Sequence, residues 1–159
     1  MRRIPSLGPR GEGWLALQVV AMVSVALAYA ASPDPSTSGT PTWAIGWLAF
    51  LIGAVFVIGG STRLSDAGSF DVLPKPRTDG SLVESGAYRF VRHPIYAGLI
   101  MGGLGLAALR DSVATLLATI ALAVILDLKR RREEDWLLDQ FPSYADYRRR
   151  VKALVPLIY

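Results

Sequence analysis

The only histidine of this 159-residue chain stands in a short polar cluster that could bind a charged ligand. The cluster is the segment from Tyr88 to Tyr96, which reads YRFVRHPIY, and a long uncharged run follows it. Ionisable residues at the edge of such a run are costly to bury and commonly have a function. Arg92 and His93 can donate hydrogen bonds to a polar head group, although His93 could instead cap or pack a helix. We therefore expect a binding site here.

A second charged cluster, LKRRREEDW, begins at Leu128. Its paired glutamates, Glu133 and Glu134, could act as general bases or bind hydroxyl and amino groups. Lys129 precedes Glu133 by four residues and Arg130 precedes Glu134 by four, so ion pairs along one helix would also explain these charges. Because the chain has one histidine and no cysteine, and because adjacent glutamates point apart on a helix, we expect no metal site.

Four apolar stretches must position these clusters. Hydrophobic residues make up 52% of the chain, and the mean hydropathy is +0.35. In the first two stretches no residue is charged, and about 18 residues at roughly 1.5 Å each nearly match the hydrocarbon thickness of a bilayer. The other two meet as a helical hairpin at Arg110 and Asp111. The sequence thus predicts an all-α integral membrane protein, a single domain over residues 1–159, with about four transmembrane helices at 14–31, 43–60, 95–109 and 112–128.

Basic residues predict how these helices are oriented. Three arginines precede the first span and the segments 61–94 and 129–159 are rich in lysine and arginine, whereas the loop 32–42 has neither. Because basic loops stay in the cytoplasm, we expect cytoplasmic N- and C-termini in a bacterial-type plasma membrane. The alternative is that the first span is a signal peptide, since it ends in a small-residue pattern from Ala28 to Ala30. The net charge of +4 fits contact with membrane lipids, so we expect no nucleic-acid partner.

Two connecting segments could contribute to a site. The loop 61–94 is unusually long, and loops of that length are commonly functional, so we expect it to be ordered over the site. Beyond the fourth span, Ser143 and Asp146 resemble a capping box that would start a short amphipathic C-terminal helix. Tyr144 and Tyr147 share one face of that helix, where packing in the core is the alternative to a binding role.

The third apolar stretch is rich in glycine. Gly98 and Gly102 stand four residues apart, a spacing that allows close contact with another helix. Such a face could pack within the chain or between copies, so the sequence leaves the oligomeric state open.

Two motifs resemble a known superfamily. The segment from Gly86 to Gly98 has the spacing G-x-Y-x-x-x-R-H-P-x-Y-x-G, which resembles the signature of the isoprenylcysteine carboxyl methyltransferase and phospholipid methyltransferase superfamily. The paired glutamates and spaced aromatic residues from Glu133 to Pro156 resemble the C-terminal pattern of the same superfamily. The resemblance covers about residues 82–159, whereas the first two spans match only as hydrophobic helices.

The resemblance implies a membrane methyltransferase that binds S-adenosylmethionine without a Rossmann fold, at the cytoplasmic end of the last hairpin and under a C-terminal helical lid. A carboxylate acceptor needs a positive group to hold it, for which we expect Arg130. An amine acceptor must first lose a proton, for which Glu133 or Glu134 would be the base. We expect Tyr144 and Tyr147 to bind the substrate. The implied cofactor-binding residues are Gly86, Tyr88, Arg92, His93, Pro94, Tyr96, Glu133 and Glu134.

The expected function is S-adenosylmethionine-dependent methyl transfer to a lipophilic acceptor at the cytoplasmic membrane face. A carboxylate acceptor, as in isoprenylcysteine carboxyl methylation, is favoured, and N-methylation of a phospholipid amine is the first alternative. Sterol reductases carry a similar Arg-His-Pro-x-Tyr segment, so an NADPH-dependent oxidoreductase is a second alternative. A membrane scaffold without enzymatic activity is the third.

Overall fold

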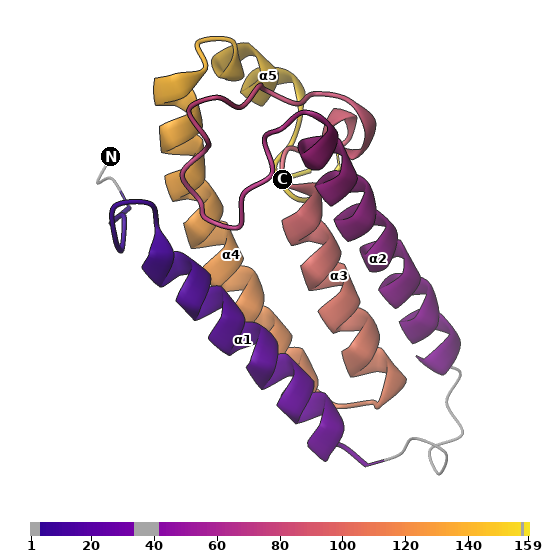
Figure 1. The fold of residues 1–159 in the computed structure, drawn as a ribbon. Coiled ribbons are helices and arrows are strands. Elements are labelled where there is room, and N and C mark those ends of the chain that lie inside the picture. The colour runs from indigo at the N-terminus through magenta and orange to yellow at the C-terminus, as the bar shows by residue number, and fades with distance from the viewer. Residues whose placement is uncertain (1–3, 34–41, 157) are drawn as a thin grey trace.

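The computed structural model describes residues 4–33, 42–156 and 158–159, and helices dominate this part of the chain (Figure 1). No strand occurs among these residues, and their one sheet-like contact is an isolated parallel bridge between Val91 and Lys152. The all-α fold class predicted from the sequence is therefore confirmed. The elements are α1 (Glu12–Ala31), α2 (Thr42–Asp66), the short 3-10 helix η2 (Gly86–Arg89), α3 (Pro94–Leu109), α4 (Val113–Gln140) and α5 (Tyr144–Arg150).

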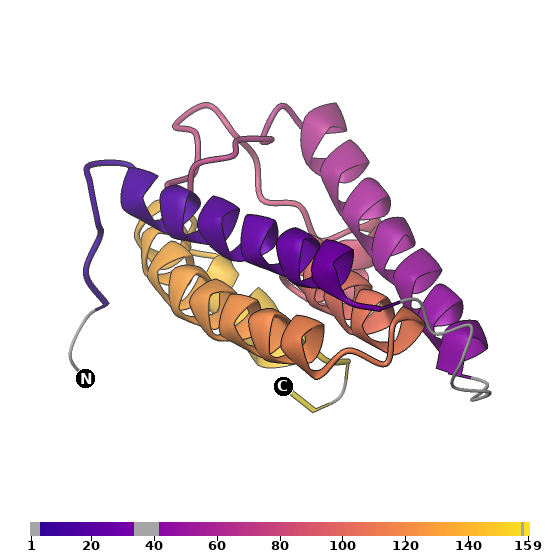
Figure 2. The same ribbon diagram turned by 90° about the horizontal axis from the view of Figure 1, so that it is seen from below.

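The four long helices form two antiparallel pairs. Helix α1 packs along α4, helix α2 packs along α3, and the hairpin of α3 and α4 joins the pairs, as Figures 1 and 2 show. Two polar contacts fix α1 against α4. Lys129 donates to the side-chain oxygen of Gln18 at 2.5 Å, and the hydroxyls of Ser32 and Ser112 lie 2.5 Å apart at the opposite end.

Glycines let α2 and α3 approach each other closely. A Cβ atom at Gly53 would lie 2.6 Å from the carbonyl oxygen of Gly98, and one at Gly105 would lie 2.7 Å from that of Gly46. The predicted close contact at Gly98 and Gly102 is confirmed, since the same Cβ position of Gly53 lies 2.7 Å from the backbone nitrogen of Gly102, although a Cβ atom on Gly102 itself would meet nothing within 4 Å. Residues seven apart differ by about 20° around a helix and residues four apart by about 40°, so Gly105 shares the face of Gly98 more closely.

The turn between α3 and α4 is as tight as the sequence predicted. Asp111 takes a φ of 46°, in the left-handed region that allows the chain to reverse. The next residue, Ser112, caps α4, because its hydroxyl accepts a hydrogen bond from the backbone N–H of Thr115 at 3.1 Å.

Helix α4 extends beyond the predicted span 112–128 and is continuous from the apolar part of the bundle through the second charged cluster. It ends shortly before Pro142, which cannot continue a helix. The capping box predicted for α5 is wrong. The Ser143 side chain makes no capping bond, because its backbone already has helical angles, and the Asp146 carboxylate pairs with Arg149 instead.

Helices α1 and α2 are long and apolar enough to cross a membrane, and α3 is apolar but shorter. Helix α2 exceeds the predicted span 43–60, since it runs to Asp66 and has Arg63 in its last turn, where a cation suits the helix dipole. Large apolar side chains are exposed on the outer faces, including Leu27 at 64% and Val55 at 67%. An apolar surface of this kind is typical of contact with lipid or a partner.

The loop 67–85 crosses one end of the bundle and is held from both sides (Figure 1). On the side of α1, Arg10 pairs with Asp71 at 2.5 Å, and the carbonyl of Arg10 accepts from the backbone N–H of Lys75. On the side of α4, Gln140 donates to the carbonyl of Arg77 at 2.6 Å. The loop therefore has defined contacts with the helices whose ends it covers.

Candidate functional site

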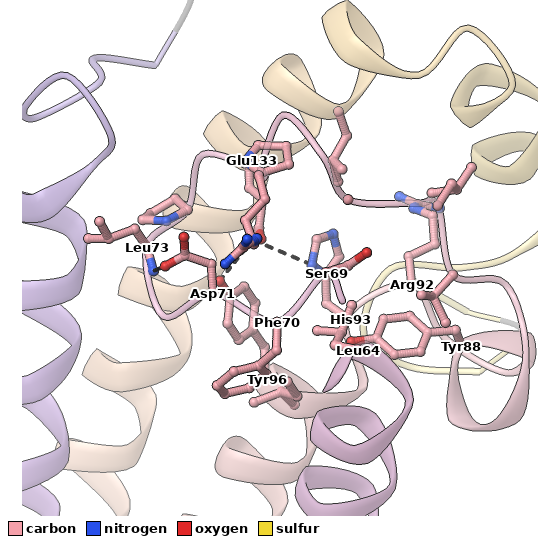
Figure 3. A pocket seen from close by; sticks show the side chains of 18 of the residues that line it. Leu64, Ser69, Phe70, Asp71, Leu73, Tyr88, Arg92, His93, Tyr96 and Glu133 are labelled. Carbon is pink, nitrogen blue, oxygen red and sulfur yellow. Dashed lines mark hydrogen bonds and ion pairs between the residues drawn. The ribbon is translucent and has the colours of Figure 1, made fainter. Parts of the chain in front are cut away.

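A cavity of about 230 Å³ lies beneath this loop, where α1 begins, α2 ends and α3 begins (Figure 3). Its walls come from all four long helices, from the loop, and from α5. Both charged clusters of the sequence contribute to it. Among the residues predicted for the site, those that line the cavity are Tyr88, Arg92, His93, Tyr96, Glu133, Tyr144 and Tyr147.

The backbone positions Arg92 and His93 at the start of α3. Their N–H groups donate to the carbonyls of Lys152 at 2.8 Å and Ala153 at 3.0 Å. These two hydrogen bonds hold the segment after α5 against the start of α3. Pro94 then occupies the first turn of α3, where a missing N–H is harmless. The backbone therefore fixes the positions from which the side chains of Arg92 and His93 extend.

The His93 side chain connects the two charged clusters. Its ring stacks on the ring of Tyr96 at 5.4 Å between centroids, with 9° between the planes. Its Nε2 lies 3.1 Å from the Glu134 carboxylate and its Nδ1 lies 3.8 Å from that of Glu133. Figure 3 shows His93, Tyr96 and Glu133 converging on the cavity. Segments about 40 residues apart in sequence therefore form one site.

Glu134 is buried among cations. Arg92 donates to Oε1 of Glu134 at 2.8 and 3.1 Å, while Arg130 and Arg148 lie 3.5 and 3.3 Å from its carboxylate. Burial would raise the pKa of this carboxyl, but the hydrogen bonds and charges of His93 and Arg92 together outweigh burial and lower the pKa to about 2. Glu134 is therefore ionised and fully engaged within the protein.

Glu133 has a different environment. The hydroxyl of Tyr96 donates to its Oε2 at 2.8 Å, and the side chain keeps 23% of its surface exposed and lines the cavity. Because successive side chains diverge around a helix, one glutamate of the pair faces the cations and the other faces the cavity. Of the two glutamates, Glu133 is thus the one that can contact a molecule in the cavity.

Three tyrosines form a buried wall. The Tyr147 hydroxyl donates to the carbonyl of Tyr88 at 2.6 Å, which ties α5 to the segment before α3. The rings of Tyr144 and Tyr147 meet edge to face at 5.8 Å. Burial raises the pKa of Tyr88 and of Tyr147, so both hydroxyls stay protonated as hydrogen-bond donors.

Four residues predicted for the site do not line the cavity: Gly86, Pro94, Arg130 and Glu134. Gly86 begins η2 with a φ of 63° and faces the side chain of Arg63. Arg130 donates to Asp127 at 2.6 and 2.8 Å and to the hydroxyl of Tyr159 at 2.7 Å. Its guanidinium is therefore already neutralised and hydrogen-bonded away from the cavity.

The structure adds cavity residues that the sequence interpretation missed, notably Gln18 of α1 and Lys129 of α4. The signal for Gln18 was available, because it is the one side-chain amide in the first apolar stretch, and polar residues in such stretches commonly have a function. Lys129 was treated as a possible partner of Glu133. In the described part of the chain no ion pair joins them, whereas the predicted pair of Arg130 and Glu134 is present.

An apolar slot of about 320 Å³ lies on the side of the bundle. Its walls come from α1, α2, α3 and α4, and Gly102 forms part of them. The slot begins one helical turn beyond Gln18, whose amide contacts the sulfur of Met22 at 3.7 Å. Its lining residues are Met22, Val25, Ala26, Phe50, Gly53, Ala54, Val57, Ile58, Gly98, Leu99, Gly102, Gly103, Leu106 and Leu122.

Similar proteins exist among metal-resistance proteins and methyltransferases. The chain is 38% identical over 81 residues to the cobalt-zinc-cadmium resistance protein CzcN of Cupriavidus metallidurans, and 42% identical over 82 residues to the nickel-cobalt-cadmium resistance protein NccN of Alcaligenes xylosoxydans xylosoxydans. Each match covers 50% of this chain. The chain is also 37% identical over 89 residues, 55% of its length, to the protein-S-isoprenylcysteine O-methyltransferase of Schizosaccharomyces pombe. The matches cover 38% of each relative's own length.

A sequence model of the phospholipid methyltransferase family matches residues 41–143. This range is more than half of the chain, and it holds both charged clusters and the helices α2, α3 and α4 that position them. The chain belongs to the phospholipid methyltransferase family.

Proposed function

We propose that this protein transfers a methyl group from S-adenosylmethionine to a lipophilic acceptor at the membrane surface. The observation that carries the proposal is the meeting of His93 and Glu133 at one cavity, with an apolar slot one helical turn further along α1. A polar cofactor and a lipophilic acceptor would each find a matching environment there. The family supports methyl transfer as the reaction.

The cavity residues fit this cofactor. Bound S-adenosylmethionine supplies a methyl group on a positively charged sulfur. Glu133, with its free surface toward the cavity, would bind the ribose hydroxyls or the amino group, and His93 would donate to the head group. Tyr88 and Tyr96 present ring surface for stacking or for a cation–π contact. Arg92 and Glu134 would hold these side chains in place through their ion pair.

A carboxylate acceptor is the favoured substrate class. A carboxylate is already the nucleophile, so the protein needs only to align it and exclude water. The buried tyrosine wall and the loop that lies over the cavity would serve the second purpose. The acceptor's apolar part would lie in the slot, whose residues are apolar on every side.

A phospholipid amine is the second candidate, and Glu133 favours it. An amine is protonated at neutral pH and must lose a proton before it attacks. Glu133 lines the cavity with a carboxylate that could accept that proton, and Tyr144 and Tyr147 would bind the substrate in either case. The acceptor series described below separates the two classes.

We also propose four membrane crossings with both ends in the cytoplasm. The support is the antiparallel order of the helices, which brings the beginning of α1, the basic half of α4 and the cavity to the same end. That end carries the basic segments, as the positive-inside rule requires of a cytoplasmic face.

The proposal is tested with protein purified in detergent. Calorimetry should show binding of S-adenosylhomocysteine and none of NADPH, and radiolabelled methyl transfer should modify a fatty acid or prenyl-thioether carboxylate more than phosphatidylethanolamine. Glu133→Gln should weaken cofactor binding about tenfold, since it removes one charge-assisted hydrogen bond. Asp139→Asn is the control, because Asp139 is exposed on the same helix. Binding of NADPH alone, or equal affinity in both variants, would refute the proposal.

A further inference from the structure

Lys129 is an unusual residue of the cavity. It lies on α4 where the apolar half of the helix gives way to the charged half, and only 2% of its surface is exposed. Lysine is almost never buried to this degree unless an anion pairs with it. Here the side chain lines the cavity.

The neighbours of Lys129 do not neutralise it. Its ammonium donates to the neutral amide of Gln18 at 2.5 Å and lies 5.1 Å from the centroid of the Tyr96 ring. No carboxylate lies within ion-pair distance of it in residues 4–33, 42–156 and 158–159. An ammonium has three donors, and Gln18 is the one hydrogen-bond acceptor that the described residues give it.

The next residue, Arg130, differs from Lys129 in its neighbours. Arg130 is almost as buried, but it has Asp127, Glu134 and the hydroxyl of Tyr159 around its guanidinium. Burial lowers the pKa of Lys129 and outweighs the opposing charge of Glu133, as expected for a cation whose counter-charge is incomplete. An anion placed in the cavity beside this ammonium would supply the missing charge.

We propose that Lys129, oriented by Gln18, binds the carboxylate of the acceptor, which is therefore an amphiphile with an anionic head and an apolar tail. This rests on the proposed function. The position of the slot supports it, because Gln18 also contacts Met22, the first slot residue of α1. A head held at Lys129 would place its tail along the slot. The cofactor carries a carboxylate as well, so the test must separate the two.

The test uses full-length protein in detergent and three probes of equal chain length: oleate, methyl oleate and oleylamine. Only oleate has an anionic head, so it should bind at least about tenfold more tightly than the other two. Lys129→Met should remove that preference and leave the affinity for S-adenosylhomocysteine within about twofold. Arg131→Met is the matched control, since Arg131 is an exposed cation of the same helix that pairs with Asp127.

Gln18→Glu keeps the proposal testable if Lys129→Met does not fold. This change places a carboxylate beside the ammonium and so neutralises it without loss of packing. Oleate should then bind about tenfold more weakly while thermal stability is kept. Unchanged oleate affinity in the Lys129 or Gln18 variant would overturn the proposal, as would a loss confined to S-adenosylhomocysteine. Failure of the unaltered protein to bind S-adenosylhomocysteine would instead refute the proposed function.

Discussion

Two neighbouring carboxylates, Glu133 and Glu134, have different roles because their surroundings differ. Glu134 is surrounded by Arg92, His93 and Arg130 and has 2% of its side chain exposed, so its negative charge holds the charged clusters together. Glu133 has one hydroxyl donor and an open side toward the cavity. A sequence motif of paired glutamates therefore combines a carboxylate that holds the charged clusters together with one that faces the cavity.

Glu134→Gln should destabilise the fold by roughly 3 kcal/mol, because breaking a buried ionic network leaves its cations unpaired. The amide keeps the size of the side chain, so the loss would reflect charge and not packing. Thermal unfolding in detergent measures it. Asp139→Asn, an exposed change of the same kind on α4, should leave the midpoint unchanged. Equal midpoints for both variants would contradict the central role of Glu134.

The same carboxylate predicts acid sensitivity. Its pKa falls from an ordinary value of 4.5 to about 2 on folding, so the unfolded chain binds the proton more tightly. The stabilisation by Glu134 should be fully present above pH 4.5 and should disappear as the pH falls toward 2. Unfolding midpoints between pH 6 and pH 2 should converge for the unaltered protein and Glu134→Gln. A constant gap between them across this range would refute the assignment.

The sequence indicated which residue types form the site, but not which of their side chains point toward the cavity. The resemblance of both motifs, in residue types and spacing, to the methyltransferase superfamily implied that His93 and the paired glutamates meet, and they lie within 4 Å. The same spacing could not distinguish Lys129 from Arg130 as the cation facing the cavity. That choice depends on Asp127 and Tyr159, which reach Arg130 only in the folded chain.

At the scale of elements, α4 links the apolar bundle to the charged residues around the cavity. Its first half packs against α1 and α3, and its second half carries every charged residue of the second cluster on the same continuous helix. Any rotation of α4 would therefore move Lys129 and Glu133 relative to His93. The glycine contact between α2 and α3 fixes the other side of the cavity, because α3 starts immediately after His93.

Gly98→Ala should loosen this contact. The added Cβ atom would lie 2.5 Å from the carbonyl oxygen of Gly53, and backbone cannot move aside as a flexible side chain does. We expect a loss of about 1–3 kcal/mol in the free energy of unfolding, the usual range for an overpacked interior. Gly59→Ala on α2 is the control, since nothing lies within 4 Å of its Cβ position. If both variants unfold at the same temperature in detergent, the contact between α2 and α3 is not as close as described.

Hydrophobic periodicity and charge predicted the helices and the hairpin, but not how they pair. Apolar runs reveal length, so α1, α2 and the continuation of α4 were predictable from the sequence. The pairing of α1 with α4 depends on side chains such as Gln18 and Ser32, whose partners on α4 the sequence does not identify. The capping box at Ser143 failed because backbone angles, not residue types, decide whether a side chain can cap.

At the scale of the whole molecule, polarity changes along the bundle axis. The cavity with its charged side chains, the covering loop and α5 lie at one end, and the slot lies further along the apolar helices. A lipophilic acceptor could therefore keep its tail among apolar helices while its head reaches the cofactor. This arrangement predicts that the slot selects the tail and the cavity selects the head.

Gly102→Phe tests that division. Because a Cβ atom at Gly102 meets nothing within 4 Å, the larger side chain can extend into the slot without displacing backbone. We expect KM for a long-chain acceptor to rise about tenfold or more, with smaller effects for short-chain acceptors, since each buried CH₂ contributes about 0.8 kcal/mol. Affinity for S-adenosylhomocysteine should be unchanged. Gly59→Phe, an equally open position of α2 outside the slot, is the control. A uniform loss for all chain lengths, or a loss of S-adenosylhomocysteine affinity, would show that the slot does not hold the tail.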